Sequence, residues 1–111
     1  MIALKITLVM VLSAAAMCSA RAESGMASFY GGGMTASGEV NGVTELTAAH
    51  RTLAFGTKVR VTNVGNGKTV IVRITARGPH RRGRIIDVSR AAARALDMID
   101  SGATMVSLEL Q

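Results

Sequence analysis

The clearest alternation of apolar and polar residues lies in two neighbouring segments, Lys58–Asn63 and Val70–Thr75. Each places valine or isoleucine at every second position, which is typical of a strand with one buried face. Between them, Gly65-Asn66-Gly67 supplies residues that tolerate positive φ, the local signal of a hairpin turn. The pattern therefore predicts an antiparallel strand pair. The residues expected on its buried face are Val59, Val61, Val70, Val72 and Ile74.

Weaker patterns predict three more strands around this hairpin. Gly25–Tyr30 alternates small and large residues and ends at a run of three glycines, Ile85–Val88 is a short apolar segment, and Met105–Leu110 alternates again. The residues from 35 to 47 are mostly small or polar, so we expect a loop there that has room for short strand segments.

One helix is predicted from Arg90 to Ile99. Ser89 has the side chain of an N-cap, since its hydroxyl can accept a free backbone N–H of the first turn. Apolar residues then recur at three- and four-residue spacing, with charged residues between them. Many short strands, frequent turn signals and a single amphipathic helix favour a small closed β-barrel, which leaves few strand edges exposed.

The first 22 residues differ from the rest of the chain. A lone Lys5 precedes an apolar run that ends in small residues, a pattern typical of a secretory signal peptide cleaved after Ala22. The run is shorter than the roughly 20 apolar residues of a membrane span. A lipid-modified Cys18 is the alternative, which Met17 disfavours because lipoprotein signals carry a small residue before the cysteine. We therefore expect a leader at 1–22 and one domain at 23–111, exported in soluble form to the bacterial periplasm.

Composition narrows the range of partners. Without Lys5 and Arg21, the chain keeps 11 cations against 7 acids, a net charge of +4, and no cysteine. An exported domain with few aromatic residues is a poor candidate for nucleic acid, so an anionic wall polymer or a membrane surface is the favoured partner. The sequence suggests no cofactor and no metal site, because two histidines and no cysteine offer no ligand spacing. We expect a monomer.

The densest charge lies between the predicted strands around residue 80. Five arginines fall within twelve positions around the only proline, Pro79, and Asp87 follows on the next strand. They are Arg73, Arg77, Arg81, Arg82 and Arg84. An irregular loop held by strands at both ends is a common way to mount a binding or catalytic site.

The motifs along the chain, taken together, resemble one known family. In order they are A-S-F-Y-G at 27–31, T-A-S-G-E at 35–39, L-T-A-A-H-R-T-L at 46–53, V-R-V-T-N at 59–63, R-G-P at 77–79 and G-R-I-I-D-V-S at 83–89. Their order and spacing are similar to those of the rare lipoprotein A family of septal lytic transglycosylases. The resemblance covers nearly all of the chain after the leader.

The resemblance implies a fold, an activity and a substrate. The fold would be mainly β, a six-stranded double-psi β-barrel with one short helix. The activity would be non-hydrolytic cleavage of peptidoglycan glycan strands, particularly strands without stem peptides, to leave 1,6-anhydro ends. One carboxylic acid with a raised pKa can suffice for this reaction, because it can protonate the leaving oxygen and then accept the hydroxyl proton of the sugar.

Carried over by position, the catalytic residues implied by the family are Glu39, His50 and an aspartate at position 76. This chain has Ala76 instead, within Thr75-Ala76-Arg77-Gly78-Pro79, and His80 replaces the aromatic residue that usually follows Gly-Pro. The residues that we expect around the substrate are Tyr30, Arg77, His80, Arg84 and Asp87.

Ala76 leaves two hypotheses for function, apart from a third alternative in which it is an engineered or sporadic inactivating change in an otherwise active protein. The first is a lytic transglycosylase that uses Glu39 and His50, impaired by the missing acid. The second is an expansin-like module that binds glycan strands without cleaving them. For His50 and Asp87, the residues alone favour structural roles: a hydrogen-bonding histidine among small residues, and an acid near a helix N-terminus.

Overall fold

A computed structural model of the chain describes residues 22–30, 33–34, 40–41 and 45–111. Glu39, Cys18 and the predicted leader up to residue 21 lie outside the described residues. The described elements run in the order β1 (Ala22–Phe29), β2 (Gly33–Met34), β3 (Val40–Asn41), β4 (Thr47–Ala49), β5 (Lys58–Asn63), β6 (Thr69–Ala76), β7 (Arg84–Val88), α2 (Arg90–Ala95) and β8 (Ala103–Leu110).

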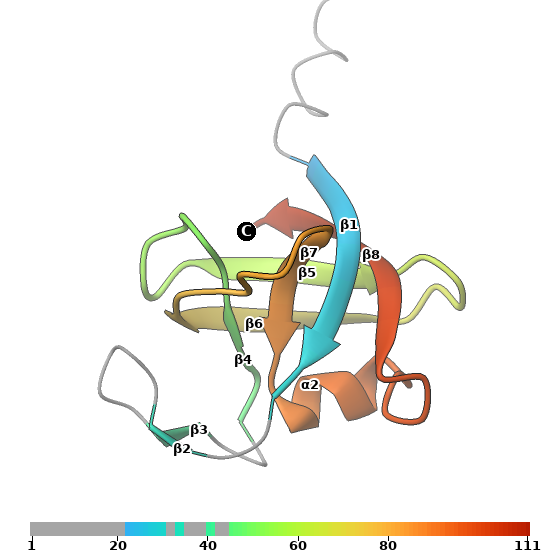
Figure 1. The fold of residues 1–111 in the computed structure, drawn as a ribbon. Helices are drawn as coiled ribbons and strands as arrows, with labels where there is room; N and C mark the ends of the chain where they lie inside the picture. Colours follow the sequence, from blue (N-terminus) through green and yellow to red (C-terminus); the bar gives the residue numbers. More distant parts are fainter. Residues whose placement is uncertain (1–21, 31–32, 35–39, 42–44) are drawn as a thin grey trace, which may run out of the picture.

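Six strands close into a barrel in the order β1-β7-β4-β6-β5-β8, and β8 pairs back with β1 (Figure 1). The β1–β7 and β4–β6 pairs are parallel, and the other four are antiparallel. The predicted six-stranded barrel with one short helix is therefore confirmed within the described residues. β2 and β3 form a separate two-stranded sheet.

The core fills the inside of the barrel with the residues that alternate inward along its strands. The largest fully buried apolar side chains are Ile74 and Ile86 from the strands and Leu96 and Met98 from the end of the helix region. Burying a side chain of this size stabilises the fold by about 1.5 to 3 kcal/mol. The inward face predicted for the hairpin is confirmed for Val59, Val61, Val72 and Ile74, while Val70 is half-buried.

The predicted hairpin is present, and its turn is fixed by a side chain. β5 and β6 pair antiparallel, and Gly67 has a φ of 78°. The buried Asn63 accepts a hydrogen bond from the Gly65 N–H at 2.9 Å and donates another to the carbonyl of Leu96 at 2.9 Å. One amide therefore joins the turn to the helix end.

The helix begins as predicted but ends earlier. Ser89 Oγ accepts from the Ala92 N–H at 3.2 Å, so the N-cap is confirmed. The helix stops at Ala95 rather than Ile99, because Asp97 takes a φ of 57°. The Met98 N–H then donates to the carbonyl of Ala93, and the Asp97 N–H to that of Arg94, as in a Schellman ending. No helix in the described part of the chain is long and apolar enough to cross a bilayer.

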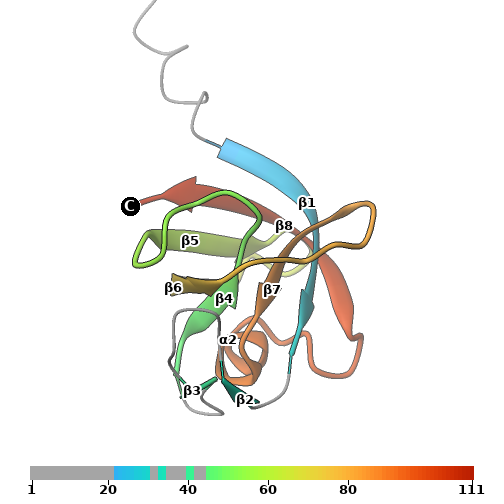
Figure 2. The ribbon, with the colours of Figure 1, turned by 60° about the vertical axis from the view of Figure 1, so that its left-hand side comes forward.

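The loop between β6 and β7 reaches across the barrel wall to β1 (Figure 2). There the Met26 N–H of β1 donates to the Gly83 carbonyl at 3.3 Å. Gly25 lets Ile85 pack directly over β1, since a Cβ at position 25 would lie 2.7 Å from Ile85 Cγ2. These contacts bring the arginine-rich loop beside the middle of β1.

Candidate functional site

Strand pairing places four residues in one row across the barrel wall. Ala49 on β4 lies opposite Ala76 on β6 and opposite Asp87 on β7, and Asp87 lies opposite Ser28 on β1. The β4–β6 register skips one residue, Thr75, just before this row. Paired residues project from the same face of a sheet. The residues that precede the row, Ala27, Ala48, Thr75 and Ile86, are buried, while Ser28, Ala76 and Asp87 are half-buried. The row therefore lies on the outer face of the barrel wall, and Ala49 is its one buried member.

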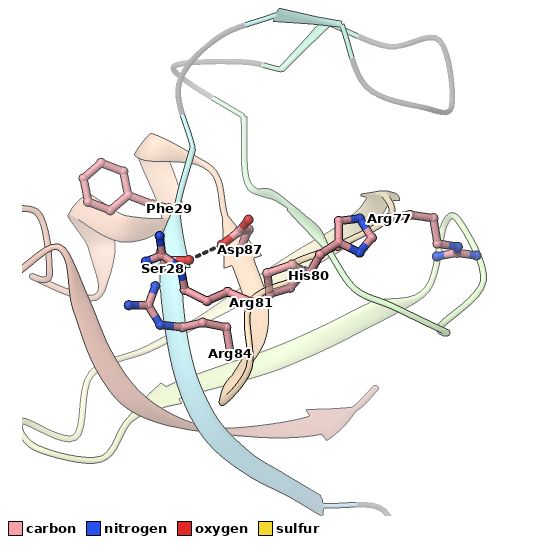
Figure 3. A pocket seen from close by; sticks show the side chains of 9 residues that line it. Ser28, Phe29, Arg77, His80, Arg81, Arg84 and Asp87 are labelled. Atoms are coloured by element: carbon pink, nitrogen blue, oxygen red, sulfur yellow. Dashed lines mark hydrogen bonds between the residues drawn. The ribbon is translucent and has the colours of Figure 1, made fainter.

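A cleft of about 410 Å³ opens at the β1–β7 end of this row (Figure 3). It lies between the two strands and the β6–β7 loop. The residues that line it are Ser28, Phe29, Arg77, Gly78, Pro79, His80, Arg81, Arg84 and Asp87. Four of the five residues predicted around the substrate line this cleft: Arg77, His80, Arg84 and Asp87. Tyr30 lies next to Phe29 in the chain but is not part of the lining.

Asp87 is the one carboxylate among the described residues of the cleft. It is half-buried, and its Oδ1 accepts a hydrogen bond from the Ser28 hydroxyl. The hydrogen bond joins residues from neighbouring strands that are 59 positions apart in the sequence. Asp87 therefore presents an oriented carboxylate to the cleft, in addition to its place before the helix.

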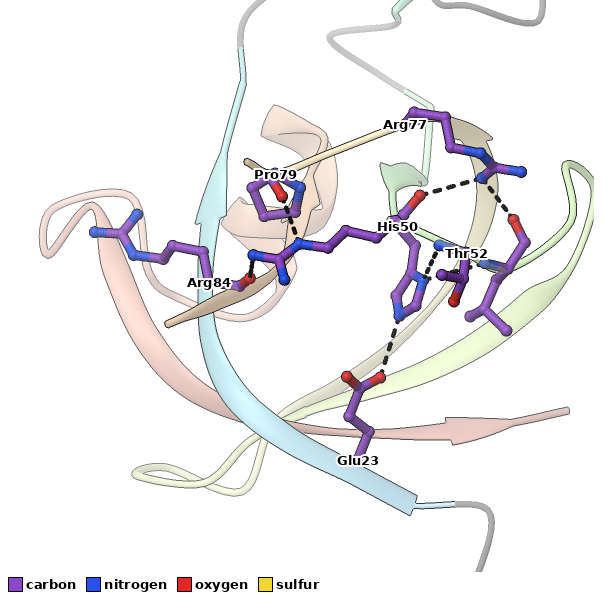
Figure 4. Close-up of polar contacts among 8 residues, drawn as sticks. Glu23, His50, Thr52, Arg77, Pro79 and Arg84 are labelled. Atoms are coloured by element: carbon purple, nitrogen blue, oxygen red, sulfur yellow. Dashed lines mark hydrogen bonds and ion pairs between the residues drawn. The ribbon is translucent and has the colours of Figure 1, made fainter. Parts of the chain in front are cut away.

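Arg51 holds the β6–β7 loop in place, a role that the sequence analysis did not predict. Its Nε donates to the carbonyl of Pro79 at 2.8 Å, and its Nη2 donates to the carbonyls of Arg81 at 3.1 Å and Arg84 at 3.0 Å. Figure 4 shows the bonds to Pro79 and Arg84. Because the five donors of a guanidinium are fixed in one plane, a single side chain can bind several carbonyls of one loop.

Arg77 makes the reverse contact, from the β6–β7 loop to the segment after β4. Its Nη1 donates to the carbonyls of His50 at 3.1 Å and Leu53 at 2.6 Å, and its guanidinium lies 4.4 Å from the ring centre of Phe55. Arg51 and Arg77 thus tie the two loops together in both directions. The predicted role of Arg77 in substrate binding stays a prediction, but its guanidinium already has partners within the fold.

His50 is buried and makes hydrogen bonds from both ring nitrogens (Figure 4). Nδ1 accepts from the backbone N–H groups of Thr52 and Leu53, at 3.2 Å each. An accepting Nδ1 leaves the proton on Nε2, which lies 3.1 Å from Oε1 of Glu23 on β1. His50 does not line the cleft. The described contacts are those of a structural histidine, and its predicted catalytic role stays a prediction.

Ala76 ends β6 beside His50, since its carbonyl accepts the His50 N–H at 3.1 Å. It is half-buried and offers only a methyl group at the position where the motif resemblance implies an aspartate. Ala49 lies between it and Asp87, so the two positions are two strands apart. At strand spacings of about 4.8 Å, their backbones are separated by about 10 Å. Asp87 therefore does not occupy the place of the missing aspartate.

The hydroxyl groups of Tyr30, Thr47 and Thr75 lie close together near the end of β1. The Tyr30 hydroxyl is 2.8 Å from Thr47 Oγ1. Thr75 Oγ1 is buried without a hydrogen bond of normal geometry among the described residues, although it lies close enough to the Tyr30 hydroxyl to influence its pKa. Burial raises the pKa of Tyr30 above its ordinary 10.0, and it outweighs the opposite effect of the two threonines.

This shift predicts a loss of stability at alkaline pH. Above about pH 10, the unfolded chain ionises Tyr30 while the folded chain keeps the proton, so the free energy of unfolding falls as the pH rises through the folded pKa. The chain has one tyrosine and no tryptophan, so tyrosinate absorbance reports this group alone. A titration midpoint at or below that of the urea-unfolded chain would contradict the prediction. Tyr30→Phe should remove the absorbance change.

No group of three or more histidine, cysteine, aspartate or glutamate side chains in the described ranges could hold a metal ion. The described lining of the cleft carries several guanidiniums, one imidazole and one carboxylate. Such a lining suits a polar ligand that carries hydroxyl groups and negative charge.

Comparison of the sequence with known proteins shows the family to which the chain belongs. The model of the lytic transglycolase family matches residues 22–108. The chain belongs to the RlpA-like lytic transglycolase family. It is 54% identical over 92 residues to the probable endolytic peptidoglycan transglycosylase RlpA of Nostoc sp.. It is 45% identical, also over 92 residues, to the endolytic peptidoglycan transglycosylase RlpA of Vibrio cholerae. The family named from the motifs is thus confirmed.

These alignments cover 78% and 79% of this chain but only 25% and 35% of the two relatives. The chain thus spans about a third or less of their length. The activity in their names belongs to much longer proteins, of which this family domain is one part.

Solved structures show the same barrel. The Streptomyces papain inhibitor superposes with a TM-score of 0.66 at 22% identity, over 80% of this chain and 93% of that chain. A mutant Clavibacter michiganensis expansin in complex with cellohexaose gives a TM-score of 0.63 at 20% identity, over 81% of this chain and 50% of the expansin. At these identities, the likeness establishes the fold alone.

Proposed function

We propose that residues 23–111 bind peptidoglycan glycan strands in the cleft between β1, β7 and the β6–β7 loop, and act there as a lytic transglycosylase domain. The observation that carries the proposal is the family match over residues 22–108, with relatives named as endolytic peptidoglycan transglycosylases. The cleft supports it, because its arginines and Asp87 offer donors and an acceptor to sugar hydroxyls and acidic groups.

The reaction needs few protein groups. The C6 hydroxyl of N-acetylmuramic acid attacks its own anomeric carbon, the glycosidic bond to N-acetylglucosamine breaks, and a 1,6-anhydro ring forms. One acid must protonate the leaving oxygen, and one base must accept the hydroxyl proton. Glu39 is the family's candidate for this work. Asp87, oriented by Ser28, is placed to accept a hydrogen bond from a bound sugar.

Binding without cleavage is the second candidate function. Ala76 removes the family's aspartate, and His50 has its ring nitrogens engaged by Glu23, Thr52 and Leu53. Loss of a positioned acid or base lowers a rate by roughly 10² to 10⁴. A domain with an intact cleft and so slow a reaction would act as a glycan-binding module.

We further propose that the leader directs export to the periplasm, where the substrate lies, and that the protein works at the septal wall. The support is the charge and apolar pattern of residues 1–22 together with the wall substrate named for the relatives. Mass spectrometry of the exported protein should show Glu23 as its first residue. A chain that keeps residues 1–22, or one whose first residue is a lipid-modified Cys18, would contradict this part of the proposal.

The enzyme proposal is tested by incubating the purified protein with peptide-free glycan strands. We expect slow appearance of 1,6-anhydro ends, detected by mass spectrometry, and retention of the protein on purified sacculi. Retention without any anhydro ends favours the binding module. If neither is observed, both candidate functions are wrong, although the family membership stands.

A further inference from the structure

Two of the three arginines that line the cleft, Arg81 and Arg84, have neither an ionic partner nor a side-chain hydrogen bond within the described residues. The ion pairs found there join His50 to Glu23 and Arg60 to Glu109. The guanidiniums of Arg81 and Arg84 enter neither, and they make no side-chain hydrogen bond in the same part of the chain. Like charges that share a cleft repel one another, and the repulsion is relieved when an anion binds between them.

The backbone beneath these two arginines is held firmly. The carbonyls of Arg81 and Arg84 are themselves the acceptors of Arg51, and the Gly83 carbonyl accepts from β1. Figure 3 shows both side chains extending from the loop toward the Ser28 side of the cleft. Because the loop is already ordered, binding an anion needs only the two side chains to be fixed, which lowers the entropic cost.

Arg82 provides an internal comparison. It lies between the two arginines in the sequence and is exposed like Arg81, but it does not line the cleft. Its charge contributes to the general field of the loop without facing a ligand in the cleft. The geometry therefore distinguishes two arginines that can contact a bound anion from one that cannot.

We propose that Arg81 and Arg84 form a carboxylate site that recognises the free lactyl group of N-acetylmuramic acid. A guanidinium fork matches a carboxylate in geometry and charge. In a glycan strand without stem peptides, the lactyl carboxylate is the group that carries negative charge, since the stem peptide is attached there as an amide. The inference rests on the proposed glycan substrate and adds which group of it the cleft selects.

The test compares three oligosaccharides of equal length by calorimetry at low salt. They are a peptide-free glycan strand, the same strand with its lactyl carboxylates converted to methyl amides, and a chito-oligosaccharide, which lacks the lactyl group. We expect the peptide-free strand with unmodified carboxylates to bind about 10-fold more tightly than the other two. The expected difference is no larger because charge-assisted hydrogen bonds at an exposed site are partly screened by solvent. A fourth ligand, a strand that carries stem peptides, distinguishes recognition of the lactyl carboxylate from recognition of the carboxylates of the peptide.

The double variant Arg81→Gln and Arg84→Gln should lose that preference while it keeps the weaker binding to the chito-oligosaccharide. Arg82→Gln is the matched control, with the same change of side chain in the same loop, and should keep the preference. Equal binding of all three oligosaccharides by the unaltered protein would overturn the carboxylate site but leave the glycan function standing. Stronger binding of the peptide-bearing strand would assign the site to the stem peptide instead. If no oligosaccharide binds, the proposed function itself fails.

Discussion

An Ala76→Asp variant should release 1,6-anhydro ends from peptide-free strands roughly 10² to 10⁴ times faster than the unaltered protein. Position 76 is half-buried at the end of β6, and its carbonyl is bonded to the His50 N–H. An aspartate there restores the family's acid beside the loop that carries Arg77. The carboxyl would project from the same face as Asp87, about 10 Å away along the strand row.

Ala76→Asn is the matched control, because it has nearly the same shape as aspartate but cannot transfer a proton in this way. It should stay as slow as the unaltered protein, and thermal unfolding of both variants should show the barrel intact. Equal gains from aspartate and asparagine would indicate a packing effect instead of an acid. If folded Ala76→Asp shows no gain, the missing aspartate is not what limits this chain.

An Arg51→Gln variant should open the β6–β7 loop and weaken glycan binding. The guanidinium makes three hydrogen bonds to loop carbonyls, and Pro79, whose carbonyl is one of them, is buried. One hydrogen bond from a charged group contributes roughly 1.5 to 3 kcal/mol. Losing the equivalent of one such bond should raise the population of the open loop by about 10- to 150-fold. Tryptic cleavage after Arg81 and Arg82, followed by mass spectrometry, measures that population.

Arg94→Gln removes an exposed arginine from α2 that neither lines the cleft nor contacts the loop carbonyls, and it should leave the cleavage rate unchanged. Arg51→Lys should give an intermediate rate, since an ammonium reaches fewer carbonyls in a fixed geometry than a guanidinium does. Variants that trypsin cleaves faster should bind glycan strands more weakly, so Arg51→Gln should have a lower affinity than Arg51→Lys. Unchanged cleavage in Arg51→Gln would show that the contacts of Arg77 and β1 hold the loop without it.

The cleft-lining arginines show which features of the site could be predicted from residue type alone. The sequence predicted a basic loop between two strands, and Arg77, His80, Arg84 and Asp87 do line one cleft. It did not reveal that Arg77 is bound by carbonyls of the His50 segment, or that Arg81 belongs to the lining. Whether an arginine faces a ligand or a backbone carbonyl depends on distant segments that no local pattern describes.

The helix shows a similar limit at smaller scale. Its N-cap at Ser89 was predicted because capping is a local hydrogen bond to the next turn. Its end was not, because the apolar spacing continues to Ile99 while the backbone turns at Asp97. Leu96 is buried as the spacing predicts, but the turn buries Met98 and leaves Ile99 half-buried, which the apolar spacing alone could not show.

The amino-acid pattern was enough to predict the hairpin of β5 and β6, its inward face, the cap of α2 and, through linked motifs, the family. These features depend on local spacing and turn residues. The site, in contrast, depends on how distant strands pair in the folded barrel. The parallel pairs β1–β7 and β4–β6 bring Ser28, Asp87, Ala49 and Ala76 into one row, and Arg51 anchors the loop above it. Such pairings join segments far apart in the chain, and their register is set by the closure of the barrel as a whole.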